Sequence, residues 1–231
     1  MPLKPQERII VALDVSSADE ARALVDRLSG RVGMFKIGSQ LFTAAGPAFV
    51  RELAARGEKV FLDLKYHDIP NTIAGAVSAA CQLGVSLVDV HALGGRAMLE
   101  AAVSALPAMG ARLLAVTILT SMNEHGHGEV GLGGQVADSV RRLARLSCDA
   151  GLDGVVASPH EVAQVREVCG PDFLIVTPGI RPAGAEAGDQ ARLATPRAAL
   201  DAGADLLVVG RPITAAADPA AAAERLAGEL G

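Results

Sequence analysis

The chain has 231 residues, 50% of them hydrophobic, with a formal net charge of −5 and only 3% aromatic residues. This length and apolar content allow a large buried core, in one α/β domain or in two smaller ones. The acidic balance, and the lack of basic runs interleaved with aromatic residues, argue against nucleic acid as a partner.

The cysteines and the apolar runs predict a cytoplasmic protein. Cys81, Cys148 and Cys169 are odd in number and widely spaced in helix-like segments, which indicates reduced thiols and neither a disulfide nor a zinc framework. Apolar runs break within about ten residues, which is too short for a membrane span. The first residues also lack the apolar stretch of a signal peptide.

Short β-branched runs alternate with amphipathic segments along the chain. The predicted strands are 9–15, 34–38, 59–65, 85–92, 113–119, 154–158, 173–178 and 206–210. The predicted helices are 18–29, 40–56, 71–83, 95–107, 135–150, 160–169, 194–202 and 213–229. Ser17 predicts a capped helix start, and Gly57 and Gly84 predict helix ends.

Strict alternation of strands and helices predicts a parallel sheet. Eight such units of roughly thirty residues favour a closed (β/α)8 TIM barrel spanning 1–231 as a single domain. A doubly wound open sheet is the alternative, but 14–17 is not a glycine-rich dinucleotide turn, and no linker marks a second domain. In a barrel the active site lies at the C-terminal ends of the strands.

Ionisable residues gather at those strand ends. The period-2 alternation of a strand puts Asp63 and Lys65 on one face. The residues that this parity turns inward are Asp14, Lys36, Asp63, Lys65, Asp89 and His91. Such a cluster is typical of a site that tunes an acid or a base, although a single pair also fits a structural ion pair or a solvated strand end. Thr117, Thr120 and Arg211 complete the polar strand ends.

Two long glycine-rich loops, 120–133 and 179–191, are candidate lids over the catalytic face. His125 and His127 in the first loop have a spacing that is only weak evidence for a metal, because a glycine-rich loop does not preorganise ligands. We therefore predict no metal site there.

The end of the last strand predicts a phosphate site. Loops after the seventh and eighth strands of barrels often bind phosphate through backbone N–H groups. Gly210 allows close approach, Arg211 can bind bidentately, and Arg181 and Gln190 can close over the same anion. The alternative is an ordinary closing turn with a surface arginine.

The run from Asp63 to Thr72 resembles the signature D-x-K-x-x-D-I-P-N-T of the orotidine 5'-phosphate decarboxylase family. Further matching segments follow in order along nearly the whole chain, and the pattern is similar to the bacterial, stand-alone form. These segments are 11–14, 35–38, 119–122, 177–182 and 209–212.

The resemblance implies a (β/α)8 homodimer that converts orotidine 5'-phosphate to UMP and CO2, the last step of de novo UMP synthesis, with no metal or organic cofactor. It implies that Lys65 donates a proton to C6, that Asp63 lies beside the substrate carboxylate, and that Asp68 and Thr72 reach into the partner's site. Asp89 has no role in this pattern, where an uncharged residue is expected. The implied substrate-binding residues are Asp14, Lys36, Asp63, Leu64, Lys65, Tyr66, His67, Asp68, Ile69, Pro70, Asn71, Thr72, Thr120, Arg181, Gln190, Gly210 and Arg211.

Within these roles, Asp14 and Lys36 bind the ribose hydroxyls, and Thr120 or the adjacent Ser121 meets the pyrimidine. Arg181, Gln190, Gly210 and Arg211 hold the phosphate. Two alternatives remain: a sister enzyme that shares D-x-K-x-x-D but uses a divalent metal, and a phosphate-ligand binding protein that kept the barrel and lost the chemistry.

Overall fold

The computed structural model describes residues 3–181 and 194–231, and these form a closed barrel of parallel strands. The strands are β1 (Ile9–Ala12), β2 (Met34–Gly38), β3 (Val60–Tyr66), β4 (Leu87–His91), β5 (Arg112–Val116), β6 (Gly154–Val156), β7 (Leu174–Thr177) and β8 (Leu206–Val209). Each strand pairs with the next, and β8 pairs with β1 to close the ring. The predicted (β/α)8 barrel is therefore confirmed.

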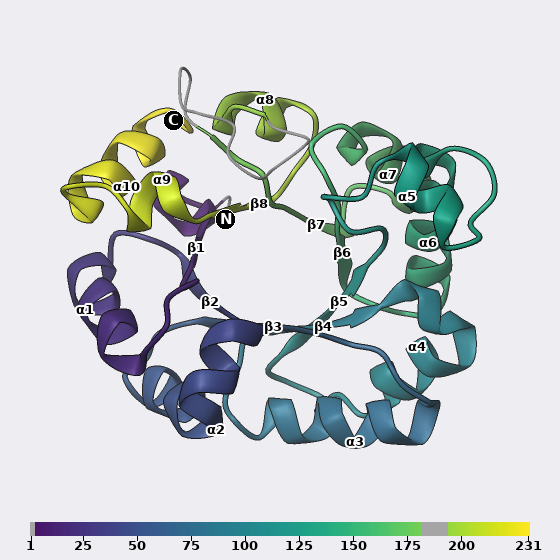
Figure 1. The fold of residues 1–231 in the computed structure, drawn as a ribbon, viewed down its shortest axis with the longest axis horizontal. Helices are drawn as coiled ribbons and strands as arrows, with labels where there is room; N and C mark the ends of the chain where they lie inside the picture. Colours follow the sequence, from purple (N-terminus) through teal and green to yellow (C-terminus); the bar gives the residue numbers. More distant parts are fainter. Residues whose placement is uncertain (1–2, 182–193) are drawn as a thin grey trace.

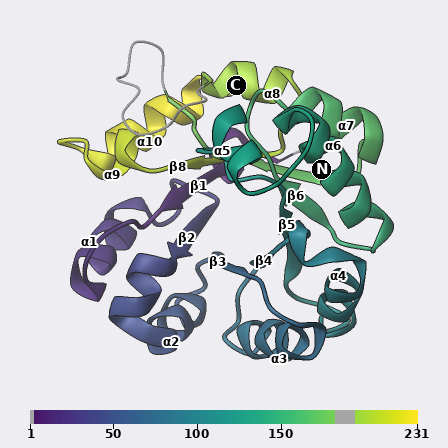
Figure 2. The same cartoon turned by 45° about the vertical axis from the view of Figure 1, so that its right-hand side comes forward.

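Helices surround the barrel on its outside (Figures 1 and 2). The helices are α1 (Ala18–Leu28), α2 (Ser39–Ala55), α3 (Pro70–Cys81), α4 (Gly95–Ser104), α5 (Glu124–Glu129), α6 (Val136–Asp149), α7 (Val162–Cys169), α8 (Pro196–Asp201), α9 (Arg211–Thr214) and α10 (Pro219–Gly228). Short 3-10 turns cover Pro5–Arg8 and Ala92–Gly94. Among the described residues, no helix combines the length and the hydropathy that crossing a membrane requires.

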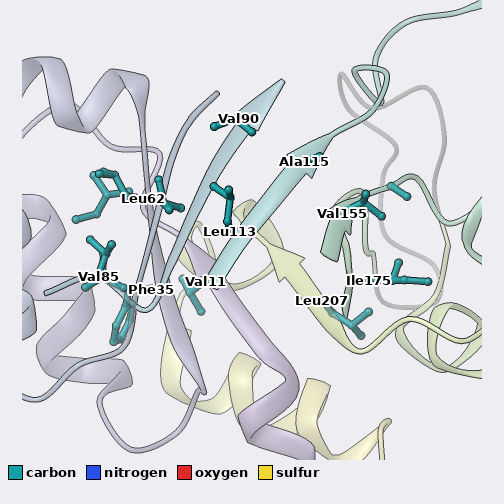
Figure 3. Packing of buried hydrophobic residues seen from close by; sticks show 14 of the residues in the cluster. Val11, Phe35, Leu62, Val85, Val90, Leu113, Ala115, Val155, Ile175 and Leu207 are labelled. Atoms are coloured by element: carbon teal, nitrogen blue, oxygen red, sulfur yellow. The ribbon is translucent and has the colours of Figure 1, made fainter. Parts of the chain in front are cut away.

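Strand parity separates two apolar layers. One set of alternate strand residues forms a cluster inside the barrel, including Ile10, Met34, Phe61 and Leu114. The other set packs outward against the helices (Figure 3). The labelled residues of this outer layer are Val11, Phe35, Leu62, Val85, Val90, Leu113, Ala115, Val155, Ile175 and Leu207. Lys36 and Asp63 share the inward parity, so the barrel lining itself carries charges toward the mouth.

Several predicted boundaries are wrong for local reasons. The predicted helix 213–229 is two helices, because Pro219 starts α10 and the Asp218 side chain accepts the N–H groups of Ala220 and Ala221. The predicted loop 120–133 contains α5, whose first turn is capped by Asn123. Helix α2 is kinked at Gly46, where φ is +70° and Pro47 follows.

Other local predictions are confirmed. The Ser17 side chain accepts the N–H of Glu20 and caps α1. Helix α3 begins one residue before its predicted start, at Pro70, a position where the missing N–H of proline costs nothing. The three cysteines are free, so none of them is in a disulfide.

Candidate active site

A cavity of about 530 Å³ lies at the mouth of the barrel. It opens at the C-terminal ends of the strands, where the sequence predicted an active site. Its polar lining comes from Asp14, Lys36, Asp63, Lys65, Thr120, Ser121, Arg181, Arg211 and Thr214. These residues lie in or just after six different strands, so closure of the barrel is what brings them together.

Four of the predicted residues form a chain of alternating charge across the cavity. Asp63 lies at its centre, with Oδ2 3.0 Å from Lys36 Nζ and Oδ1 bonded to Lys65 Nζ. The Lys36 ammonium also reaches Asp14 Oδ1 at 3.4 Å. Each charge in this array therefore has an opposite charge beside it.

The array keeps Asp63 and Lys36 ionised despite their burial. Burial alone favours the neutral form of each group. For Asp63 this is outweighed by the charges of Lys36 and Lys65, which hold the pKa of this carboxyl well below its usual range. For Lys36 the charges of Asp63 and Asp14 outweigh burial and raise the pKa of the ammonium.

Strand β3 is irregular where it supplies these groups. Its pairing with β4 shifts between Leu62 and Tyr66, and Lys65 has a φ of +52°. The N–H of Lys65 is donated to Asp89 Oδ1 at 2.8 Å, and Asp89 is fully buried. The irregular backbone at Lys65 is therefore stabilised by Asp89, a side chain of the neighbouring strand β4. The sequence predicted that Asp89 faces inward but gave it no function.

The residues on either side of Lys65, and those that follow, turn away from the cavity. Leu64 and Tyr66 pack against the helix-facing core, and the centroids of the His67 and His91 rings lie 5.5 Å apart. Beyond them the chain is exposed: Asp68 accepts the N–H of Ile69 through Oδ1, and Ile69 is 66% exposed. The implied site residues Leu64, Tyr66, His67, Asp68, Ile69, Pro70, Asn71 and Thr72 are thus outside the lining of this chain's cavity.

Two arginines converge on the opposite side of the cavity. Arg181 donates to the carbonyl of Ile180, and Arg211 begins α9 directly after Gly210. Burial and the positive charge of Arg211 lower the pKa of Arg181, so the two guanidinium groups are close enough to repel each other. An anion between them would relieve that repulsion. The fourth predicted phosphate residue, Gln190, lies outside the described residues.

The loop that carries Thr120 contains helix α5, which anchors the loop to helix α6. His127 in α5 is buried, and its Nε2 lies 2.9 Å from Ser139 Oγ in α6. The Glu124 carboxylate accepts the N–H of Val136. His125 and His127 therefore do not face each other as ligands, and no cluster suited to a metal occurs in the described part of the chain.

The sequence analysis predicted polar lining residues of the cavity but none of its apolar lining residues. The apolar lining is Ala12, Phe61, Val116, Ile118, Leu119, Val156, Pro178 and Val208. Inward parity along each strand was the signal for Phe61, Val116, Val156 and Val208. Thr117, by contrast, points away from the cavity and donates to the carbonyl of Val156 at 3.3 Å.

Comparisons with known proteins agree on one family. The family model described as Orotidine 5'-phosphate decarboxylase / HUMPS family matches residues 7–226. A Moorella thermoacetica protein named orotidine 5'-phosphate decarboxylase is 54% identical, over 97% of this chain and 92% of its own length. A Halorhodospira halophila protein of the same name is 57% identical, over 96% and 95%. The crystal structure of orotidine 5'-phosphate decarboxylase from Lactobacillus acidophilus matches with a TM-score of 0.86 and 39% identity, over 96% and 98%.

Proposed function

The chain belongs to the orotidine 5'-phosphate decarboxylase / HUMPS family, and from that premise we propose that it decarboxylates orotidine 5'-phosphate to UMP and CO2. This reaction completes de novo UMP synthesis in the cytoplasm. The observation that carries the proposal is the ionised Asp63 fixed between Lys36 and Lys65 inside the barrel mouth. No metal or organic cofactor enters the proposed reaction.

Lys65 is the proposed proton donor. Loss of CO2 from C6 leaves a carbanion with no electron sink in the ring, so the uncatalysed barrier is very high, and each 1.4 kcal/mol removed gives about tenfold in rate. An ammonium held at C6 stabilises this charge and then delivers its proton. The ion pair with Asp63 orients Lys65 Nζ in the cavity, which supports this role.

Asp63 and Asp14 have different proposed roles, one at the substrate carboxylate and the other at the ribose hydroxyls. Asp63 lines the cavity, and its proposed neighbour is the substrate carboxylate, where like charges would repel until CO2 leaves. Asp14 and Lys36 line the same cavity and offer an acceptor and a donor to the ribose hydroxyls. Thr120 and Ser121 line the cavity on the loop after β5, where the pyrimidine edge is expected.

The phosphate occupies the arginine side of the cavity in this proposal. Arg181 and Arg211 supply the positive charge, and Gly210 permits close approach of the backbone. The family resemblance adds Gln190 to this proposed set. Binding energy from this remote group is available to stabilise the transition state at the ring.

Arg211→Ala tests the phosphate site. A lost charge-assisted hydrogen bond costs about 1.5–3 kcal/mol, so we expect KM to rise about 10- to 150-fold while the thermal midpoint changes little. Steady-state kinetics with orotidine 5'-phosphate and thermal unfolding measure the two effects. Arg225→Ala, an exposed arginine of α10, is the matched control and should leave KM unchanged. With orotidine, which lacks the phosphate, Arg211→Ala should leave KM unchanged. An unchanged KM for orotidine 5'-phosphate would contradict phosphate binding by Arg211.

The exposed segment after Lys65 supports a shared site in a homodimer. Asp68 and Thr72 lie outside this chain's cavity, and the apolar side chains Ile69 and Leu93 on the same side of the barrel are 66% and 43% exposed. A second copy packed there would cover this apolar surface and receive Asp68 and Thr72 into its own cavity.

The alternative activity is a sugar-phosphate reaction that needs a divalent metal. A direct assay separates the two: loss of orotidine 5'-phosphate is followed by ultraviolet absorbance with and without EDTA. We expect turnover that EDTA does not change. If folded protein shows none in either sample, the proposal fails, and a screen of sugar phosphates with Mg²⁺ tests the alternative; tight nucleotide binding without turnover would identify a binding protein.

A further inference from the structure

The backbone of Lys65 has a conformation that its sequence does not favour. Among the described non-glycine residues it alone has a positive φ, a conformation that costs about 1–2 kcal/mol for a residue with a side chain. Leu62 pairs with Val88 and Tyr66 pairs with Val90, so three residues of β3 lie opposite Asp89 alone. This bulge removes Lys65 from the regular ladder of backbone hydrogen bonds.

The Asp89 side chain replaces the backbone acceptor that the Lys65 N–H lacks in the bulge. Its Oδ1 accepts the N–H of Lys65 at 2.8 Å from a fully buried position. Without this bond the partly buried N–H of Lys65 would lose its acceptor, which is costly. Asp89 therefore fixes the backbone from which the Lys65 side chain reaches Asp63.

The second oxygen of Asp89 shows which protonation state fits. Oδ2 is buried and has no hydrogen-bond partner in the described part of the chain, although the Asp89 carboxyl lies against that of Asp63. Two ionised carboxylates in contact have no hydrogen between them and repel each other. A proton on Asp89 removes the repulsion and gives the buried oxygen a hydrogen to donate.

The surrounding charges put that proton on Asp89 and not on Asp63. Asp63 has two ammonium partners, Lys36 and Lys65, whereas the hydrogen bond that Asp89 accepts from Lys65 comes from the backbone N–H. Burial and the negative charge of Asp63 raise the pKa of Asp89 well above its usual range. Tyr66 also senses Asp89, because burial and the Asp89 charge raise the pKa of the Tyr66 hydroxyl.

We propose that Asp89 is a positioning residue that works in its neutral form, accepting the Lys65 N–H and donating its own O–H to Asp63. It ties the backbone of Lys65 to the carboxylate that holds the Lys65 ammonium. A neutral group does this without adding a second negative charge beside that ammonium. The inference rests on the proposed function only in taking Lys65 as the proton donor.

Paired substitutions test the positioning role. Asp89→Asn keeps an acceptor for Lys65 and offers an N–H donor to Asp63, so kcat should stay within about threefold. Asp89→Ala removes both bonds, and a displaced Lys65 should lower kcat by about 10²-fold with KM nearly unchanged. Val88→Ala is the matched control, because this neighbour faces the helices; it should lose stability but keep kcat. Equal losses in Asp89→Asn and Asp89→Ala, or full activity in Asp89→Ala, would overturn the proposal.

A measurement without substrate keeps this inference separate from the proposed function. In protein labelled with ¹³C at aspartate carboxyls, the resonance missing in Asp89→Asn identifies Asp89. We expect that resonance to stay at the protonated position from about pH 5 to about pH 8, where an ordinary aspartate is ionised. An ionised Asp89 in this range refutes the neutral form even if the wild-type enzyme is fully active. A protonated Asp89 in a protein that does not decarboxylate would instead refute the function alone.

Discussion

Lys65→Ala is expected to lower kcat by at least about 10⁴-fold, because the substitution removes both the proton donor and the positive charge beside C6. Single-turnover assays with excess enzyme give the residual rate. Folding should survive, since Asp63 keeps its 3.0 Å ion pair with Lys36 and the residue 65 backbone can still bond Asp89. UMP binding by calorimetry and thermal unfolding check that the site and the fold remain.

The matched control is Lys59→Ala, an exposed lysine just before β3. It should leave kcat unchanged. If Lys65→Ala retains wild-type turnover, Lys65 is not the proton donor, and the alternating array at the barrel mouth has a binding role only.

Mixing two inactive variants should restore activity. Asp68→Ala alone should be strongly impaired, since the proposed dimer places Asp68 in the partner's site. In a Lys65→Ala and Asp68→Ala mixture, one site of each mixed dimer has an intact Lys65 from one subunit and an intact Asp68 from the other. Random exchange of equal amounts makes about half of the dimers mixed, so about a quarter of the wild-type sites are recovered.

Subunit exchange must be verified with differently tagged chains, and Lys65→Ala mixed with Lys65→Ala is the control that should stay inactive. If mixed dimers form and activity does not return, the sites are not shared between subunits. In that case the exposed Asp68 and Ile69 belong to a solvent-facing turn.

The barrel was predictable because its strands repeat one pattern. Alternation along β3 and along the other strands fixed which residues face inward, and the predicted inward positions of Lys36 and Asp63 are the observed ones. The strand ends were less accurate: β1 stops at Ala12 and β5 at Val116, because the following residues belong to the loops that build the cavity.

The missed features depend on contacts between distant parts of the chain. Helix α5 occurs in a glycine-rich stretch because Asn123 caps it and His127 anchors it to Ser139. Glycine content alone predicted a loop there. The role of Asp89 was equally hidden, since its partner is a backbone N–H that is free only because β3 bulges at Lys65.

The unequal exposure of the two lysines determines how the site resets after each reaction. The Lys65 side chain is 37% exposed, whereas that of Lys36 is 11% exposed. In the proposed mechanism CO2 departs as a neutral molecule and C6 keeps the proton of Lys65, which leaves the array one positive charge short. Because Lys65 is open to water, solvent can reprotonate its amine directly. One proton is then consumed per turnover, and no second acid from the protein is needed. The enclosed Lys36 remains a permanent charge throughout the cycle.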